Sequence, residues 1–328
     1  MTVSTTQAIQ MTEVGAADLL RLVELPLAEP GAGEVLIRQT AIGINYVDVY
    51  HRQGRYAVPL PAVLGVEAAG VVEAVGSADT GFTVGQRVAY ASFPPGAYAG
   101  HRVMPAARVV ALPDGVDDRT AAAGLFAGLT AHYLIHRLYP AKGGETVLFH
   151  AAAGGVGLIA GQWLKSLGVR TIGTVGSAGK VALARDHGYD EVLVLGRDDV
   201  PARVRALTQG KGVPAVFDSI GKDTIDLSLD SLAPHGMLVS FGSASGPVPP
   251  LSVEDLRARG SLQVAAPTFG TYMANRSDIT TSAAALFAAI AAGTIRIEVG
   301  GVYPLAEAAR AHADLEGRRT TGSLLLIP

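Results

Sequence analysis

The residues best suited to chemistry in this chain form a glycine-rich turn. Residues 145–157 read ETVLFHAAAGGVG, so an apolar segment leads into the spacing Ala152-x-Gly154-x-x-Gly157. Between a strand and a helix, Gly154 lets the backbone approach a pyrophosphate, Gly157 permits close helix–strand packing, and the helix N-terminus offers N–H groups to the anion. The turn therefore predicts a dinucleotide site, in which Ala152 can replace the first glycine if its φ is negative.

The end of the next expected strand indicates which dinucleotide binds. An acidic residue about 20 positions beyond the last glycine would bind the ribose 2′-hydroxyl of NAD. Residues 174–180 read TVGSAGK, without an acid but with Ser177 and Lys180. A lysine on a 2′-phosphate makes a charge-assisted hydrogen bond worth roughly 1.5–3 kcal/mol. The segment favours NADPH over NADH, although a solvated surface lysine is the plainer alternative.

Residues that would define a familiar reaction are missing around this turn. The chain has no cysteine, which excludes disulfides, thiolate-bound zinc, iron–sulfur clusters and a cysteine nucleophile. It has neither a tyrosine followed four residues later by lysine nor a Gly-x-Ser-x-Gly elbow. His132 and His136 have helical i, i+4 spacing, but packed or solvated histidines explain them, and we expect no metal. Metal-free hydride transfer then requires an acceptor that is already electrophilic, or one protonated by a side chain or water.

Polar residues in the first third could serve such an acceptor. Asn45, Tyr50 and Tyr56 fall between two strand-rich stretches, a reasonable place for the lip of a cleft. An amide or a phenol can donate a hydrogen bond to a carbonyl oxygen as negative charge grows on it, which lowers the barrier. Each tyrosine alone could equally be half-buried structure.

The secondary structure expected to position these residues differs between the first third of the chain and the rest. Short β-branched segments bounded by Gly and Pro fill the first third, and strands and helices alternate from about residue 119, which implies a parallel sheet covered on both faces. The expected strands are 35–39, 68–75, 87–92, 146–149, 171–175, 191–195, 215–219, 237–241 and 322–327, and the expected helices are 119–138, 155–167, 178–187, 201–208, 224–232, 279–292 and 305–316.

Composition sets further limits. The chain has 328 residues, 49% hydrophobic and 17% charged, which predicts two domains with a large core. A net charge of −3 argues against a nucleic-acid surface. The longest apolar run, 283–292, is short of the roughly 20 residues of a membrane span. The first ten residues lack the pattern of a secretory signal, so we expect a cytoplasmic protein.

Eight stretches spread over the whole chain form a recognisable set. They are 30–35 (PGAGEV), 45–56, 65–70 (GVEAAG), 128–130 (GLT), 144–165, 217–221 (FDSIG), 239–242 (VSFG) and 322–328 (GSLLLIP). In these stretches the chain resembles the zinc-independent NADPH:quinone oxidoreductases of the medium-chain dehydrogenase/reductase superfamily. The resemblance implies an α/β fold in which a GroES-like β-rich catalytic domain, 1–127 completed by 269–328, carries an inserted Rossmann domain, 128–268, with a doubly wound parallel sheet. It also implies NADPH in the interdomain cleft and a homodimer joined through the edge of the Rossmann sheet.

The resemblance also implies a role for individual positions. Asn45, Tyr50 and Tyr56 would line the nicotinamide and substrate pocket, and Val66 stands where zinc enzymes of the superfamily have a histidine. The residues that would contact NADPH are Thr130, Ala152, Gly154, Gly155, Val156, Gly157, Gly176, Ser177, Lys180, Ser219, Phe241, Gly242 and Arg318. Close relatives carry a tyrosine near the adenine phosphate where this chain has Leu195, which would weaken NADPH binding by about 1 kcal/mol unless Arg197 compensates.

These observations predict an NADPH-dependent quinone reductase. Hydride would pass from nicotinamide C4 to the quinone, and Tyr50, Asn45 or water would stabilise the developing phenolate. An alkenal, enone or enoyl-thioester reductase is an alternative, because the same pocket can serve any conjugated carbonyl; a coenzyme A substrate would call for basic residues such as Arg52, Arg55 and Arg276. A non-catalytic NADPH-binding redox sensor is the alternative from another class.

Overall fold

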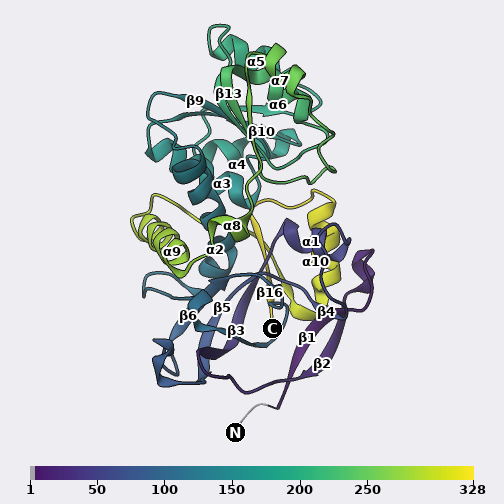
Figure 1. The fold of residues 1–328 in the computed structure, drawn as a ribbon, viewed down its shortest axis with the longest axis vertical. Coiled ribbons are helices and arrows are strands. Elements are labelled where there is room, and N and C mark those ends of the chain that lie inside the picture. The colour runs from purple at the N-terminus through teal and green to yellow at the C-terminus, as the bar shows by residue number, and fades with distance from the viewer. Residues whose placement is uncertain (1–3) are drawn as a thin grey trace. The chain divides into compact units, whose positions relative to one another are not determined.

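The computed structural model describes residues 4–328, which form two compact units (Figure 1). Unit 1 extends to Leu129 and resumes at Met273–Gly293 and Ile297–Pro328, whereas unit 2 comprises Thr130–Tyr272 and Thr294–Arg296. The first and last segments of the described residues therefore both belong to unit 1. Residues 1–3, which the sequence places at the start of the first domain, lie outside the described residues.

Unit 1 is built mainly from short strands, as the sequence of its first third predicts. Its elements are β1 (Thr5–Met11), η1 (Ala17–Leu19), β2 (Arg21–Pro26), β3 (Glu34–Ile44), α1 (Tyr46–Arg52), β4 (Ala62–Val63), β5 (Glu67–Val75), η2 (Ala78–Thr80), β6 (Arg87–Ala91), β7 (His101–Pro105), η3 (Ala106–Arg108), β8 (Val109–Ala111), most of α2 (Asp118–His132), α9 (Arg276–Ala291), β15 (Val299–Pro304), η6 (Leu305–Glu307), α10 (Ala308–Glu316) and β16 (Ser323–Ile327).

Two sheets organise unit 1. The larger has the order β15-β16-β3-β5-β6-β8, with β7 also paired to β3, and the smaller has the order β2-β1-β4. The last strand of the chain completes the larger sheet, because β16 pairs antiparallel with β3 and sets Leu325 opposite Gly43. The C-terminal segment thus supports the strand that leads directly into α1.

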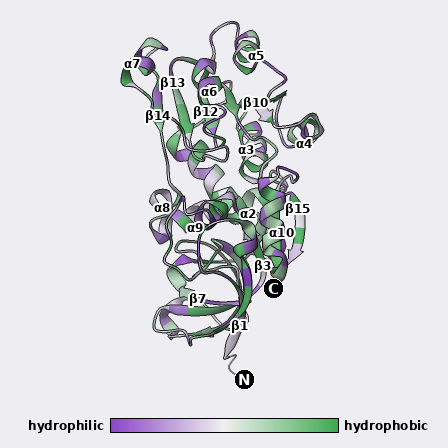
Figure 2. Ribbon diagram, turned by 90° about the vertical axis from the view of Figure 1, so that its right-hand side faces the viewer, coloured by the Kyte–Doolittle hydropathy of each residue, from purple (hydrophilic) through white to green (hydrophobic). Residues whose placement is uncertain are grey.

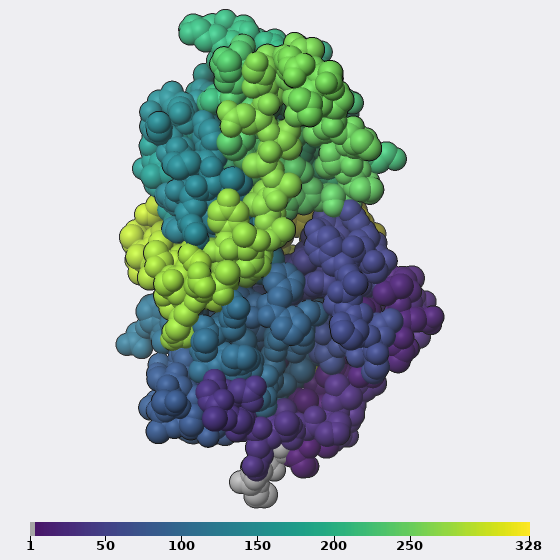
Figure 3. All heavy atoms as spheres, in the orientation of Figure 1, coloured from purple at the N-terminus to yellow at the C-terminus, as the bar shows by residue number. Residues whose placement is uncertain are grey.

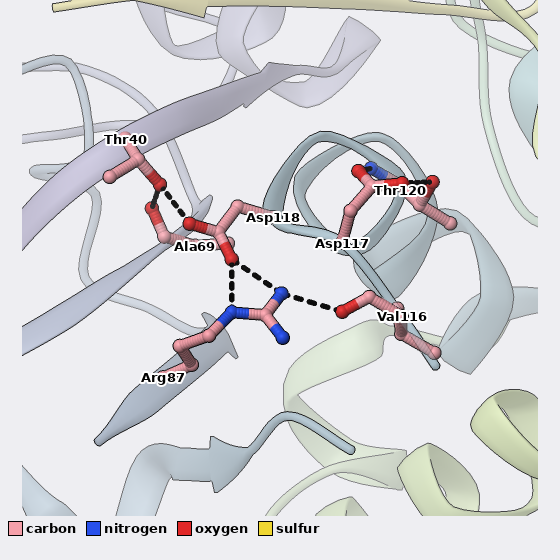
Figure 4. A network of polar contacts seen from close by, with 7 residues as sticks. All are labelled: Thr40, Ala69, Arg87, Val116, Asp117, Asp118 and Thr120. Carbon is pink, nitrogen blue, oxygen red and sulfur yellow. Dashed lines mark hydrogen bonds and ion pairs between the residues drawn. The ribbon is translucent and has the colours of Figure 1, made fainter. Parts of the chain in front are cut away.

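A polar network anchors the start of α2 on this sheet (Figure 4). The Arg87 side chain from β6 donates to Asp118 Oδ1 through Nε at 2.9 Å and Nη2 at 2.7 Å. Thr40 from β3 donates to Asp118 Oδ2 at 2.6 Å. Because an acidic residue in the first turn also complements the positive end of the helix dipole, these contacts hold α2 in place as it leaves the sheet.

Unit 2 contains the alternating strands and helices expected from residue 119 onward. Its elements after α2 are η4 (Tyr133–Leu138, a π-helical turn), β9 (Thr146–Phe149), α3 (Gly155–Ser166), β10 (Arg170–Val175), η5 (Ala178–Lys180), α4 (Val181–Asp186), β11 (Glu191–Val194), α5 (Val200–Leu207), β12 (Val213–Asp218), α6 (Ile225–Ser231), β13 (Leu232–Ser240), α7 (Val253–Ala258), β14 (Gln263–Ala265) and α8 (Phe269–Tyr272).

The unit 2 sheet is parallel throughout and covered on both faces. Its order is β11-β10-β9-β12-β13-β14, and Figure 2 shows the hydrophobic character of its strands. Ile172 packs into the apolar cluster formed with α5 and α6. Gly173 points to the opposite face, where an added Cβ would lie 2.7 Å from the Tyr189 ring, which also lies against Gly161 of α3. This doubly wound sheet confirms the fold class.

Several short elements of the structure were not predicted from the sequence. It did not indicate β1, β2, β4, β7, β8, β14, β15, α1, α7 or α8. Most are edge or two- to seven-residue segments whose pairing depends on residues far away in the chain, so local periodicity carries little signal for them. The segment 45–56, taken from sequence as a connection, instead begins with α1.

Candidate active site

The glycine-rich turn joins β9 to α3, and close packing explains its last glycine. A Cβ on Gly157 would lie 2.4 Å from the carbonyl oxygen of Ala151, so a larger residue does not fit. Gly154 caps α3 with extended backbone at φ −86° and ψ 168°. The positive φ of the turn, 54°, falls at Ala151 rather than at Ala152. The backbone is therefore as tight as a pyrophosphate site requires.

The first turn of α3 supplies hydrogen-bond donors. The first intrahelical bond runs from Leu158 N to Gly154 O at 2.9 Å. Gly155, Val156 and Gly157 come before it, and N–H groups at these positions have no acceptor inside a helix and lie at the positive end of its dipole. These residues fit the pyrophosphate of a dinucleotide such as NADPH.

The remaining cofactor candidates of unit 2, apart from Thr130, follow the carboxyl ends of three strands. They are Gly176, Ser177 and Lys180 after β10, Ser219 after β12, and Phe241 and Gly242 after β13. The order of connection reverses between the neighbouring strands β9 and β12, and dinucleotides bind at such switch points. A Cβ on Gly242 would lie 2.9 Å from Ser219 O, so these two turns are in contact. The structure brings these candidates to one edge of the sheet.

The other predicted site residues lie elsewhere. Thr130 is buried near the end of α2, and Arg318 belongs to unit 1, in the turn after α10, with a φ of 57°. Asn45, Tyr50 and Tyr56 also belong to unit 1. The site residues predicted from sequence are thus divided between the two units.

Asp218, at the end of β12, shapes the turn that carries Ser219, and the sequence did not single it out. Its carboxylate is buried and accepts hydrogen bonds from Ile220 N at 2.7 Å, Thr224 Oγ1 at 2.8 Å and Ser228 Oγ at 2.7 Å. Several donors on one carboxylate make it a rigid anchor. Asp218 therefore fixes this turn from inside the unit.

The end of β11, the third strand of unit 2 along the chain, bears on recognition of the 2′-phosphate of NADPH. Leu195 packs at the edge of the apolar cluster of the sheet. Arg197 forms an ion pair with Asp198, with Nη2 and Oδ2 3.0 Å apart. The guanidinium expected to compensate for Leu195 therefore forms an exposed ion pair, and Ser177 and Lys180 are the other polar candidates on this side.

Asn45 begins α1 and is held from two sides. Its backbone N–H donates to Asp48 Oδ2 at 2.9 Å, a carboxylate three residues ahead that caps the helix start. Its side-chain Nδ2 donates to Glu67 Oε1 at 2.6 Å. The helix start was readable from Asn45 and Asp48 alone, because this spacing is a sequence signal for an N-terminus.

Glu67 is a functional candidate that the sequence did not identify as one. Its carboxyl also accepts a hydrogen bond from Phe126 N at 2.7 Å, and burial raises its pKa to about 8. Gly43 makes room for it, since a Cβ there would lie 2.3 Å from Glu67 Oε1. At neutral pH the group is therefore neutral, and it orients the Asn45 amide without placing a negative charge beside a developing phenolate.

The two tyrosines of the predicted site are in ring contact. The Tyr50 and Tyr56 centroids lie 5.3 Å apart, edge to face, and Tyr56 is 49% exposed whereas Tyr50 is buried. Tyr46 also packs edge to face on Tyr50, and the Arg55 guanidinium lies 4.3 Å above the Tyr50 ring. The segment after α1 lies at the molecular surface, in the blue-violet area at the right of Figure 3.

A buried polar relay extends from α1 to α10. Arg52 Nε donates to His312 Nδ1 at 3.3 Å, and His312 Nε2 lies 2.9 Å from the Tyr98 hydroxyl, which lies 3.0 Å from Asp48 Oδ2. Because an arginine only donates, His312 carries its proton on Nε2 and donates to Tyr98, which donates to Asp48. The relay orders the carboxylate that caps Asn45.

Two of the three arginines considered for a coenzyme A substrate have structural roles. Arg52 is 2% exposed and paired with Glu316. Arg276 Nη1 donates to the carbonyl oxygen of Ala106 at 2.9 Å. Neither guanidinium stands ready for a phosphate.

The histidines at helical spacing pack on an aromatic ring. His132 and His136 have ring centroids 4.9 Å apart and lie 5.5 and 5.2 Å from the Trp163 ring. Val66 is fully buried. Within residues 4–328, no cluster of three or more histidine or carboxylate side chains could hold a metal ion. In the same part of the chain, no helix is both long and apolar enough to cross a bilayer.

Comparison with known proteins first defines the class. Residues 31–114 match the alcohol dehydrogenase GroES-like domain, and residues 155–289 match the zinc-binding dehydrogenase family. A GroES-like domain joined to a doubly wound nucleotide-binding sheet is the architecture of the medium-chain dehydrogenase/reductase superfamily, so this part of the sequence-based prediction is confirmed.

Individual relatives narrow the class. A quinone oxidoreductase of Pseudomonas aeruginosa is 51% identical, over 98% of this chain and 99% of that protein. A 2-haloacrylate reductase of Burkholderia is 44% identical over 96% of both chains. The structure of Escherichia coli quinone oxidoreductase complexed with NADPH superposes with a TM-score of 0.96 at 42% identity, over 98% of this chain and 100% of that one. The chain belongs to the quinone oxidoreductase family.

Proposed function

We propose that this protein is an NADPH-dependent quinone reductase that works by metal-free hydride transfer. The glycine-rich turn at Gly157, here called the cradle, carries the proposal. No side chain fits between Gly157 and Ala151 O, and the turn and the N-terminus of the helix that follows it suit a pyrophosphate. The near full-length similarity to a quinone oxidoreductase solved with NADPH supports the same cofactor and reaction.

Bound NADPH would supply a hydride from nicotinamide C4, and the chain's own residues would do the rest. We assign to Asn45 a hydrogen bond from its second Nδ2 hydrogen to the quinone oxygen that gains negative charge. Glu67 holds that amide in one orientation. Tyr50 and Tyr56 would form an aromatic wall for the acceptor. A proton from water completes the hydroquinone, so hydride plus proton balance the two-electron reduction.

The preference for NADPH rests on Ser177 and Lys180. Ser177 is exposed and precedes η5, and Lys180 is the last residue of η5. Both residues therefore belong to the segment that contacts a 2′-phosphate in this fold. Arg318 is proposed as a further phosphate contact. Because Leu195 offers no hydrogen bond, we expect a moderate rather than an absolute preference.

Reduction of a conjugated acid or carbonyl is the second candidate, and the Burkholderia relative favours it. An anionic acrylate needs a cation at its carboxylate. Around α1, Arg52 is buried with Glu316, and burial lowers the pKa of His51, which keeps that imidazole neutral. Arg55, whose guanidinium lies over the Tyr50 ring, is the cation in these surroundings that suits an acrylate carboxylate, so this acceptor class stays as the second candidate.

The edge of the unit 2 sheet bears on the assembly of the protein. β14 lies at the edge of the unit 2 sheet and has Val264 41% exposed. Because unpaired strand edges are templates for pairing, we propose a homodimer joined through this edge. A cytoplasmic location is the companion proposal.

Anaerobic oxidation of NADPH in the presence of 1,4-benzoquinone tests the function. A heat-denatured sample measures direct reduction of the quinone by NADPH. Rapid oxidation that requires the folded protein supports quinone reduction. Binding of NADPH without any rate above this control, with benzoquinone and with an enone, would overturn the proposal and favour a redox sensor.

A further inference from the structure

Tyr189 is a buried aromatic residue of unit 2 that the proposed mechanism does not use. It follows α4, in the turn that leads to β11, and is 3% exposed. Its ring packs against two glycines. A Cβ on Gly161 of α3 would lie 2.5 Å from the ring carbon Cε2, and a Cβ on Gly173 of β10 would lie 2.7 Å from Cδ1. The ring therefore fills the space that these glycines leave between the helix and the strand.

The hydroxyl of Tyr189 reaches the first turn of α3. It donates a hydrogen bond of 2.8 Å to the carbonyl oxygen of Gly157. Burial raises the pKa of Tyr189 well above its usual value, so the phenol keeps its proton and remains a donor. A carbonyl oxygen has two lone pairs, and the N–H group four residues further along a helix uses only one of them. Tyr189 thus adds a hydrogen bond to the turn that is proposed to hold the pyrophosphate.

The peptide groups of this turn form a chain of hydrogen bonds that starts at Tyr189. The carbonyl of Gly157 shares its peptide group with the N–H of Leu158, which donates to Gly154 O at 2.9 Å. The carbonyl of Gly154 in turn shares its peptide group with the N–H of Gly155, which has no acceptor inside the helix. Hydrogen bonds linked in this way polarise and strengthen one another. The chain therefore ends at an N–H group that fits the pyrophosphate.

We propose that Tyr189 is a positioning residue for the pyrophosphate of NADPH, because it fixes the first turn of α3 and makes the Gly155 N–H a stronger donor through this chain. The inference rests on the proposed NADPH-dependent function and adds a residue to the binding of that cofactor. Tyr189 acts through the backbone and is buried beneath the turn. It lies 32 positions beyond Gly157, outside the glycine-rich motif itself.

Tyr189→Phe keeps the ring and removes the hydroxyl. Tyr139→Phe is the matched control, because Tyr139 is also in unit 2 and its hydroxyl donates to Glu145 Oε2 at 3.1 Å. Fluorescence titration gives the Kd for NADPH, and turnover of benzoquinone gives KM and kcat. We expect Kd and KM for NADPH to rise about two- to fivefold in Tyr189→Phe only, with kcat unaltered at saturating NADPH. An unchanged Kd, or an equal rise in both variants, would overturn the proposal, whereas NADPH binding and turnover by the unsubstituted protein would leave the proposed function standing.

The hydrogen-bond chain is tested by NMR of the Gly155 amide in the protein without cofactor. Glycine labelled with carbon-13 at the carbonyl and with nitrogen-15 selects the amides of glycines that follow a glycine. The sequence has three such pairs, 143–144, 154–155 and 300–301, and Gly155→Ala identifies the Gly155 signal by its loss. We expect the Gly155 amide proton to move upfield in Tyr189→Phe, because its N–H is less polarised, and to keep its position in Tyr139→Phe. No movement of this signal, or an equal movement at Gly301 in unit 1, would contradict the chain whatever the affinity for NADPH.

Discussion

Asn45 Nδ2 donates a hydrogen bond of 2.6 Å to Oε1 of Glu67, a carboxyl that is only 1% exposed. The residue proposed to contact the acceptor is thereby oriented from the interior of unit 1. Its backbone is held as well, because the Asp48 carboxylate accepts from Asn45 N and from Tyr98. A donor held in advance costs no reorganisation when charge develops on the substrate.

Replacement of Asn45 by alanine removes this donor. We expect kcat with benzoquinone to fall about 100-fold, the loss typical of one hydrogen bond to a developing oxyanion, while the KM for NADPH stays unchanged. Stopped-flow single-turnover rates separate the hydride step from product release. Unaltered single-turnover rates in both Asn45→Ala and Tyr50→Phe would show that water alone stabilises the phenolate.

The pKa of Glu67, raised to about 8 by burial, predicts a pH dependence. Below pH 8 the Glu67 carboxyl is neutral; above it, a negative charge forms on the group that holds the Asn45 amide and opposes the developing phenolate, so kcat/KM should decline. Asp48, which caps the Asn45 backbone and whose pKa burial raises to about 7, ionises before Glu67 and is not affected by the Glu67→Gln substitution. Glu67→Gln cannot ionise and should hold its rate from pH 7 to 9.5. The measurement is kcat/KM against pH with the non-enzymatic rate subtracted. The same alkaline decline in the variant would assign it to another group.

Lys180→Ala tests whether Lys180 binds the 2′-phosphate of NADPH. Loss of a half-exposed charge-assisted hydrogen bond should raise the KM for NADPH about tenfold and leave the KM for NADH unchanged. Lys165→Ala is the matched control, because Lys165 is an exposed lysine in the last turn of α3. If NADH and NADPH are affected alike, Lys180 does not read the phosphate.

Gly157→Ala tests the cradle. The new Cβ would lie 2.4 Å from Ala151 O, so the turn must open, and we expect a loss of about 1–3 kcal/mol in the free energy of unfolding together with weaker NADPH binding. Gly115→Ala is the control, since a Cβ there meets nothing within 4 Å. Urea unfolding and NADPH fluorescence titration give the two readouts. Wild-type values for both would remove the basis of the cofactor proposal.

His312 predicts sensitivity to acid. Burial lowers its pKa to about 3, below the unfolded value of about 6.5, so the unfolded chain binds more protons between these values. Stability is therefore full above pH 6.5 and falls as the pH drops, by up to about 2 kcal/mol at pH 5 from this group. His312→Gln should be less stable at pH 7 but lose less between pH 7 and 5. Equal slopes in urea unfolding would contradict this.

Predictions from the sequence were most reliable where the contacts that form an element are local. The glycine spacing, the strand before it and the helix after it lie within about 25 residues, and β9 has the bounds expected, 146–149. The parallel sheet followed from alternation of strands and helices, since such strands are buried on both faces. Asn45 and Asp48, three residues apart, are a local signal for the start of α1 as well.

The tertiary structure decided what depends on distant residues. Glu67 is 22 positions from Asn45, and His312 is 260 positions from Arg52; no spacing in the chain announces either contact. The sequence also does not indicate that His51, Val58 and Pro94 line one apolar hollow. The sequence by itself determined the class of fold and the cofactor turn, because backbone geometry and periodicity are local. The environment that sets a pKa, a hydrogen-bond direction or an acceptor's shape is assembled only by packing.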